Sequence, residues 1–180
     1  MKTRNTLVVV GLLVGIALWV QSFGPPAWAK LRLGRGADIQ VDGMTVREIQ
    51  AAFNQAEEAI NNGNLEALME LYSQDYRFGG LTKDDMRTTW KDFFAQYHRI
   101  STSHSFSRIV VQPGKRPTAE VTCTGSLWAT SNESNLRVNL ASWLGNFHYL
   151  IYEQGNWQIL GQGLSAPKAS QFGGAPPPLF

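Results

Sequence analysis

Two histidines are the side chains of this sequence that best suit acid–base chemistry. His104 and His148 fall in two different stretches rich in β-branched and aromatic residues, which predicts two different strands. A neutral imidazole can take up and release a proton near pH 7, so two imidazoles facing one interior would suit general acid–base catalysis. The alternative is that each is a partly exposed strand histidine, or one bonded within the sheet. His98 falls at the predicted end of a helix, where a cation complements the dipole, and we expect it to be structural.

The single cysteine and the spacing of the other ligand types predict no metal site. Cys123 lies mid-strand in VTCT, and nothing nearby in the sequence lowers the pKa of its thiol, so we expect a buried, inert side chain. One cysteine excludes an intramolecular disulfide and a cysteine-based zinc cluster. The chain has no Gly-rich phosphate loop. We therefore expect no metal and no cofactor.

The elements that must position these residues are three helices followed by a run of strands. Thr45 and Glu48 are typical of a capping box at the start of the first helix, and Asn64 and Thr82 are suitable caps for the second and third. Each helix has an apolar stripe at 3–4 residue spacing. Strands are expected over 101–111, 118–130, 137–153 and 156–162. This order predicts an α+β fold with three N-terminal helices packed on one face of an antiparallel sheet.

The two ends of the chain differ from this central domain. Residues 1–29 have a basic start, a 14-residue apolar run and an Ala-Trp-Ala end, which is the layout of a cleaved secretory signal. Residues 30–43 are Gly-rich and predict a linker, 44–163 form the domain, and the Pro- and Gly-rich tail 164–180 is expected to be disordered. We expect an exported protein in a periplasm, a lumen or the extracellular space. The alternative is a domain held on the membrane by an uncleaved N-terminal helix.

Charge excludes nucleic acid as an expected partner. The whole chain carries a formal charge of +2, but residues 1–29 hold two of its 16 basic groups and none of its 14 acidic groups. The remaining chain is therefore neutral, and it lacks the basic field that nucleic acid or an anionic membrane would require.

Three segments resemble the SnoaL-like branch of the nuclear transport factor 2-like superfamily. They are NGNLEAL with LYSQDYRF at 62–78, the Trp90 and Phe94 pair, and FHY with EQGNWQI at 147–159. The resemblance implies a cone-shaped, cystatin-like roll: a strongly bent sheet wrapped around the helices, with an apolar pocket at its open end. It also implies a homodimer through the outer sheet face, where we expect Trp128 to be an anchor.

Enzymes of that superfamily suggest where chemistry could lie. In ketosteroid isomerase-like members a carboxylate base follows the second helix, but the matching positions here are Gly79 and Gly80. Asp75 is the nearest substitute, and we expect it to cap the helix end or to bond a turn. Two histidines from different strands with a tyrosine resemble instead the acid–base set of scytalone dehydratase-like members, which implies roles for His104 and His148.

Aromatic side chains are abundant enough to line a pocket for a flat apolar ligand as well as to fill the core. The candidate pocket residues are Tyr72, Tyr76, Trp90, Phe94, Phe106, Phe147 and Tyr149. We expect a non-catalytic exported module that binds a small apolar ligand or a protein partner. The alternative is a cofactor-free lyase or isomerase in which His104, with His148 and a tyrosine, is the general acid and base.

Overall fold

The structure of the protein is a computed structural model that describes residues 32–161. The predicted signal sequence at 1–29 and the predicted disordered tail at 164–180 lie outside the described residues. In the described part of the chain, no helix has both the length and the apolar composition needed to cross a membrane.

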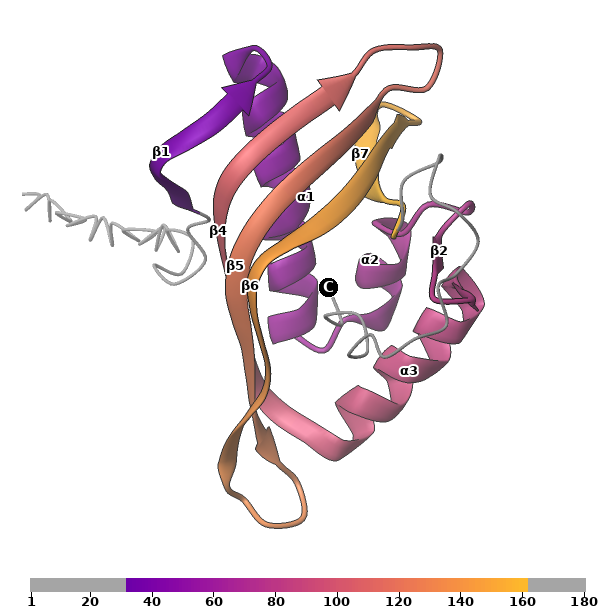
Figure 1. Cartoon of the computed structure of the whole chain (residues 1–180). Coiled ribbons are helices and arrows are strands. Elements are labelled where there is room, and N and C mark those ends of the chain that lie inside the picture. The colour runs from indigo at the N-terminus through magenta and orange to yellow at the C-terminus, as the bar shows by residue number, and fades with distance from the viewer. Residues whose placement is uncertain (1–31, 162–180) are drawn as a thin grey trace, which may run out of the picture.

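Five strands of residues 32–161 form one bent sheet, in the order β1-β4-β5-β6-β7. The strands are β1 (Arg32–Gln40), β4 (Tyr97–Gln112), β5 (Thr118–Ser131), β6 (Arg137–Glu153) and β7 (Asn156–Ile159). Neighbours pair antiparallel except β1, which runs parallel to β4. Register shifts interrupt the β4–β5 and β5–β6 ladders, and such bulges bend a strand. The long strands curve as a result, with the helices on one side of them (Figure 1).

Three helices occupy that side of the sheet within the described range. They are α1 (Gly43–Asn61), α2 (Leu65–Glu70) and α3 (Lys83–Gln96), and the short strands β2 (Arg77–Phe78) and β3 (Leu81–Thr82) form a separate hairpin before α3. The apolar stripe of α1 is buried, with Ile49, Phe53 and Ile60 almost free of solvent. It packs on the inner face of the sheet beside Phe106 and Ile109. The predicted α+β fold class is confirmed.

Two of the three helix N-termini have the capping residues that the sequence predicts. The Asn64 side chain accepts from the backbone of Ala67, and Thr82 forms a capping box with Asp85. The prediction of a capping box at Thr45 was wrong. Asp42 is the cap of α1 instead, and its carboxylate accepts hydrogen bonds from the backbone of Met44 and Thr45 at 2.8 and 3.0 Å.

Two segments differ from the prediction because they pair with distant partners. Within the predicted linker 30–43, residues 32–40 form β1, an edge strand bonded to β4. The third helix ends at Gln96, so His98 lies in β4 rather than at a helix end. There its Nδ1 is 2.6 Å from the side-chain oxygen of Asn132.

Candidate functional site

Four polar side chains meet in the apolar core between α1 and the sheet. Glu57 comes from α1, His104 from β4, Cys123 from β5 and His148 from β6. Glu57 lies four residues after Phe53 and three before Ile60, so helical spacing places it on the buried stripe. Cys123 and Val121 are both buried on the inner face of β5, and Val121 pairs with His148. Strand alternation and register therefore bring the three sheet residues together.

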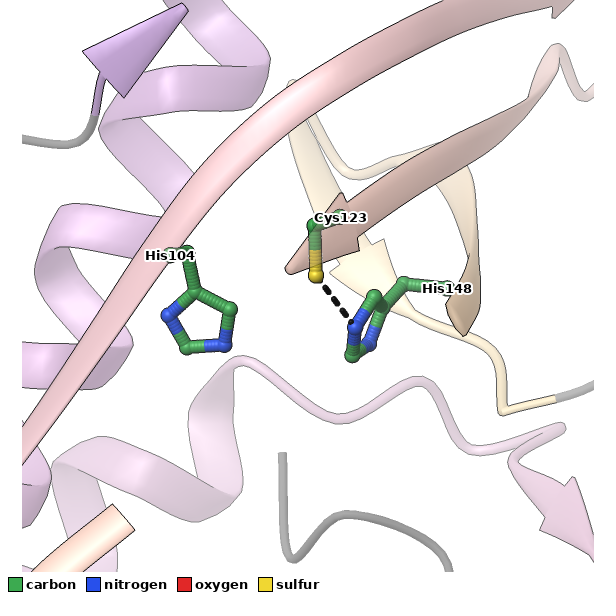
Figure 2. Close-up of side chains that lie close together, drawn as sticks. All are labelled: His104, Cys123 and His148. Carbon is green, nitrogen blue, oxygen red and sulfur yellow. Dashed lines mark hydrogen bonds between the residues drawn. The ribbon is translucent and has the colours of Figure 1, made fainter. Parts of the chain in front are cut away.

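Glu57 and His104 form a buried ion pair or charge-assisted hydrogen bond. Glu57 Oε1 lies 2.7 Å from His104 Nδ1, and the two side chains are 3% and 0% exposed. With Glu57 as a carboxylate, which only accepts hydrogen bonds, the donor of this bond is His104 Nδ1. This fixes the orientation of the ring and turns Nε2 toward the residues of β5 and β6 (Figure 2).

Cys123 and His148 form the second half of the cluster. Cys123 Sγ is 2.9 Å from His148 Nε2 (Figure 2). Trp143 Nε1 donates a hydrogen bond to the same sulfur at 3.1 Å. Burial raises the pKa of the Cys123 thiol to about 12. Burial, with a smaller contribution from His104, lowers the pKa of His148 to about 3. This pair is therefore a neutral thiol and a neutral imidazole at neutral pH.

Aromatic rings surround the polar cluster and link its two halves. The ring of Phe53 meets those of His104, His148 and Phe106 edge-on, at centroid distances of 5.3, 5.7 and 4.7 Å. The indole of Trp143 lies 5.0 Å from His104, and the two imidazoles are 5.8 Å apart. His148 is partly exposed while His104 is buried, so His148 lies nearest to solvent.

The residues predicted as acid–base groups thus lie together, whereas the predicted pocket aromatics fall into separate groups. Phe106 belongs to the cluster through Phe53. A second group surrounds Trp90, which donates a hydrogen bond to the Tyr72 hydroxyl at 2.9 Å and stacks on Phe94, while Tyr76 packs on Tyr72. Burial raises the pKa of the Tyr72 and Tyr76 hydroxyls, so both are neutral.

The remaining two predicted pocket residues lie on the opposite side of β6. His148 faces the core, so alternation directs Phe147 and Tyr149 to the outer face. Phe147 is 55% exposed, and Tyr149 is the register partner of Glu120. Neither side chain shares a face of the sheet with His148.

Sequence reasoning missed Glu57, Trp143 and the proximity of Cys123 to a base. Glu57 carried a usable signal, since it is a carboxylate on the apolar stripe of a helix. The side chain of Asp75, the substitute carboxylate considered from the sequence, pairs instead with Arg116, which also bonds Glu153.

The structure also brings metal-ligand types together that are far apart in the sequence. One donor atom each of His104, Cys123 and His148 lies within 4.8 Å of the other two. Ligand spacing along the chain did not predict this group, because such spacing says little about residues on three neighbouring strands.

Comparisons with known proteins agree with this fold. No curated protein matches the chain. A conserved protein from Planctomyces limnophilus DSM 3776 superimposes with a TM-score of 0.56 at 19% identity, over 67% of this chain and 94% of that one. A ketosteroid isomerase-like protein from Erwinia carotovora atroseptica SCRI1043 does so with a TM-score of 0.50 at 16% identity, over 67% and 94%. The profile of the SnoaL-like domain matches residues 49–169. The chain therefore belongs to the SnoaL-like domain family, within the nuclear transport factor 2-like fold.

Proposed function

We propose that this SnoaL-like domain is a cofactor-free lyase or isomerase that moves a proton with the Glu57–His104 pair, assisted by His148. The observation that carries the proposal is the buried 2.7 Å contact between Glu57 and His104, with a second imidazole 5.8 Å away. Burying such groups in an apolar core costs free energy unless they are paired, and buried titratable pairs are candidates for functional sites. Of the two functions that the sequence left open, this geometry favours the enzyme.

Each group has a distinct task in the proposed reaction. Glu57 accepts the proton of His104 Nδ1 and holds the ring in place, and we assign the other ring nitrogen, Nε2, as the base. His104 Nε2 removes a proton from a substrate carbon next to an electron-withdrawing group, and the bonding pair moves toward that group. The proton then returns to another carbon in an isomerase, or to a departing hydroxyl group in a lyase, which releases water. His148 hydrogen-bonds the polar group of the substrate.

The surroundings of the pair support a small, largely apolar substrate. Phe53, Phe106 and Trp143 line this part of the core, and His148 lies on its more exposed side. Aromatic walls with a few polar groups are typical of small-molecule sites. The fold itself hosts many chemistries, so the ketosteroid isomerase-like neighbour supports the class of reaction by analogy only.

The non-catalytic module remains the second candidate, and the outer sheet face favours it. Leu144 and Phe147 are 85% and 55% exposed on β6, which suits a protein partner. Both functions are compatible with the proposed export of the chain after cleavage near Ala29. N-terminal sequencing of the expressed protein tests that export, and a start at Met1 in membranes would contradict it.

Proton transfer can be tested without knowing the product. The full chain is incubated in D2O with a panel of cyclic enones and β-hydroxy ketones, and deuterium incorporation at carbon is followed by NMR. We expect the wild-type chain to catalyse exchange of at least one compound. A general base contributes about 10²–10⁴-fold, so His104→Asn should slow that exchange by about 100-fold or more.

The matched control is His98→Asn, which changes the histidine bonded to Asn132 outside the cluster. It should keep the wild-type exchange rate. Equal exchange rates for the wild type and His104→Asn would reject catalysis by this pair. A wild type that exchanges no panel compound, but carries a bound apolar ligand in native mass spectrometry, would support the binding module instead.

A further inference from the structure

We propose that His104, Cys123 and His148 form a binding site for one borderline transition-metal ion, zinc or copper. The three donor atoms already lie within 4.8 Å of one another, and they come from the adjacent strands β4, β5 and β6. Donors around a tetrahedral zinc ion are ~3.5 Å apart, given bond lengths of about 2.0–2.3 Å. Side-chain movements of about 1 Å would therefore bring all three within bonding distance of one ion.

Each of two ligands has an outer partner of the kind that metal sites use. Glu57 accepts from His104 Nδ1 at 2.7 Å, which is the carboxylate–histidine arrangement that orients a metal-bound imidazole. Trp143 donates to Cys123 Sγ at 3.1 Å, a bond that would stabilise a metal-bound thiolate. Figure 2 shows that Nε2 of His104 points toward Cys123 and His148, away from α1.

The donor set identifies the class of ion. Two imidazole nitrogens and one thiolate sulfur suit zinc and copper, whereas magnesium and calcium require oxygen ligands. A bound divalent ion would place its charge beside one thiolate and the buried Glu57 carboxylate. The thiol proton would be released on binding, as in other cysteine-ligated sites.

This inference does not depend on the proposed proton transfer. A metal ion on His104 Nε2 would occupy the nitrogen that acts as the base, so the metal-bound form would be inactive in proton transfer. Binding is therefore measured without substrate, and failure of one proposal leaves the other testable.

The test uses the full chain stripped of metal with a chelator. Equilibrium dialysis against zinc, and separately against copper(I), is followed by metal analysis of the protein. We expect one ion per chain from at least one of the two metals. Cobalt(II) supplies a spectroscopic probe, because cysteine ligation produces sulfur-to-cobalt charge-transfer absorption.

The variants separate this site from other surface donors. Cys123→Ser should abolish the charge-transfer absorption, and Glu57→Gln should weaken binding by about 10–100-fold, as loss of an outer partner does elsewhere. His98→Asn is the matched control and should bind as the wild type does. Circular dichroism establishes that each variant is folded. The proposal would be overturned if Cys123→Ser binds metal as the wild type does, or if the wild type binds neither zinc nor copper(I) at one ion per chain.

Discussion

The Glu57 carboxylate and the His104 imidazole lie where neither can exchange its partner for bulk water. Both side chains are almost fully buried, and Phe53 and Trp143 pack against the imidazole. A buried charged group that loses its partner keeps the full penalty of desolvation. Each residue should therefore depend energetically on the other.

A double-mutant cycle measures that dependence. Glu57→Gln and His104→Asn should each destabilise the fold, and the double variant should be more stable than the sum of the single losses implies. The expected coupling is about 1.5–3 kcal/mol, the range for hydrogen bonds to charged groups. Urea unfolding of the four chains gives the value, and a coupling near zero would show that the contact is not made in solution.

The contacts of single residues could be predicted only where the contacting residues are close in the sequence. His104 and His148 were recognised from residue type alone, and the structure places them together. The Cys123–His148 contact was missed because it joins positions 25 residues apart across the β5–β6 ladder. The register between the strands decides such contacts. The sequence pattern of β6 alone did not show which of its two faces is buried.

At the scale of the elements, Gly125 lets three strands approach one another beside the cluster. A side chain there would place Cβ 2.0 Å from the Ser103 carbonyl oxygen on β4 and 2.5 Å from the Trp143 ring on β6. The same Trp143 donates its indole N–H to Cys123. The close packing at Gly125 therefore positions part of the site.

Gly125→Ala should destabilise the fold strongly and displace Trp143. Overpacking usually costs about 1–3 kcal/mol, and a backbone clash belongs at the upper end of that range or above it. Gly114→Ala is the control, because a Cβ there would meet nothing within 4 Å. Thermal unfolding followed by tryptophan fluorescence compares the two, and equal melting temperatures would contradict the packing described.

The cap of α3 should make stability depend on pH. Hydrogen bonds from the Thr82 side chain and backbone hold the pKa of Asp85 below its ordinary 3.8. A carboxyl group whose pKa is lower in the folded state than in the unfolded state stabilises the folded state above pH 3.8. This stabilisation is lost as the pH falls through the pKa of the folded state. Asp85→Asn should therefore unfold more easily than wild type at pH 6, with the difference shrinking below pH 3.8.

The control for this cap is Asp84→Asn, a change in the same first turn of α3. It should alter the pH dependence less than Asp85→Asn does. A pH-independent difference between wild type and Asp85→Asn would show that the carboxylate does not cap the helix.

The helices and long strands could be predicted because their signals are local. The stripe of α1, the caps at Asn64 and Thr82, and the span of β6 all follow from short-range patterns. β1 was missed because its sequence is rich in glycine and charge, and its pairing with β4 is parallel and distant along the chain. A register irregularity in that pair further obscures any alternation.

At the scale of the whole molecule, the sheet buries one face under the helices and leaves large apolar side chains on the other. Leu144 and Phe147 are exposed on β6, and Trp128 on β5 is 39% exposed. Exposed apolar groups on an open sheet face favour association. We expect a homodimer that covers this outer face.

Phe147→Arg should weaken that dimer, with the dissociation constant raised at least about tenfold, which corresponds to about 1.4 kcal/mol. Leu136→Arg is the control, since Leu136 is also exposed but lies in the loop between β5 and β6. Light scattering after size-exclusion chromatography gives the mass over a range of concentrations. A monomeric wild type, or a dimer weakened only by Leu136→Arg, would contradict this interface.

The proposed chemistry requires the Glu57–His104 pair to be a working proton-transfer site rather than a structural contact. The most direct measurement is the deuterium exchange rate of an active panel compound in Glu57→Gln and Glu58→Gln. These neighbours differ in the feature that matters: Glu57 is buried against His104, and Glu58 is exposed on the same helix. We predict a loss of about tenfold or more in Glu57→Gln and an unchanged rate in Glu58→Gln. Equal exchange rates in the two variants would contradict the proposed site.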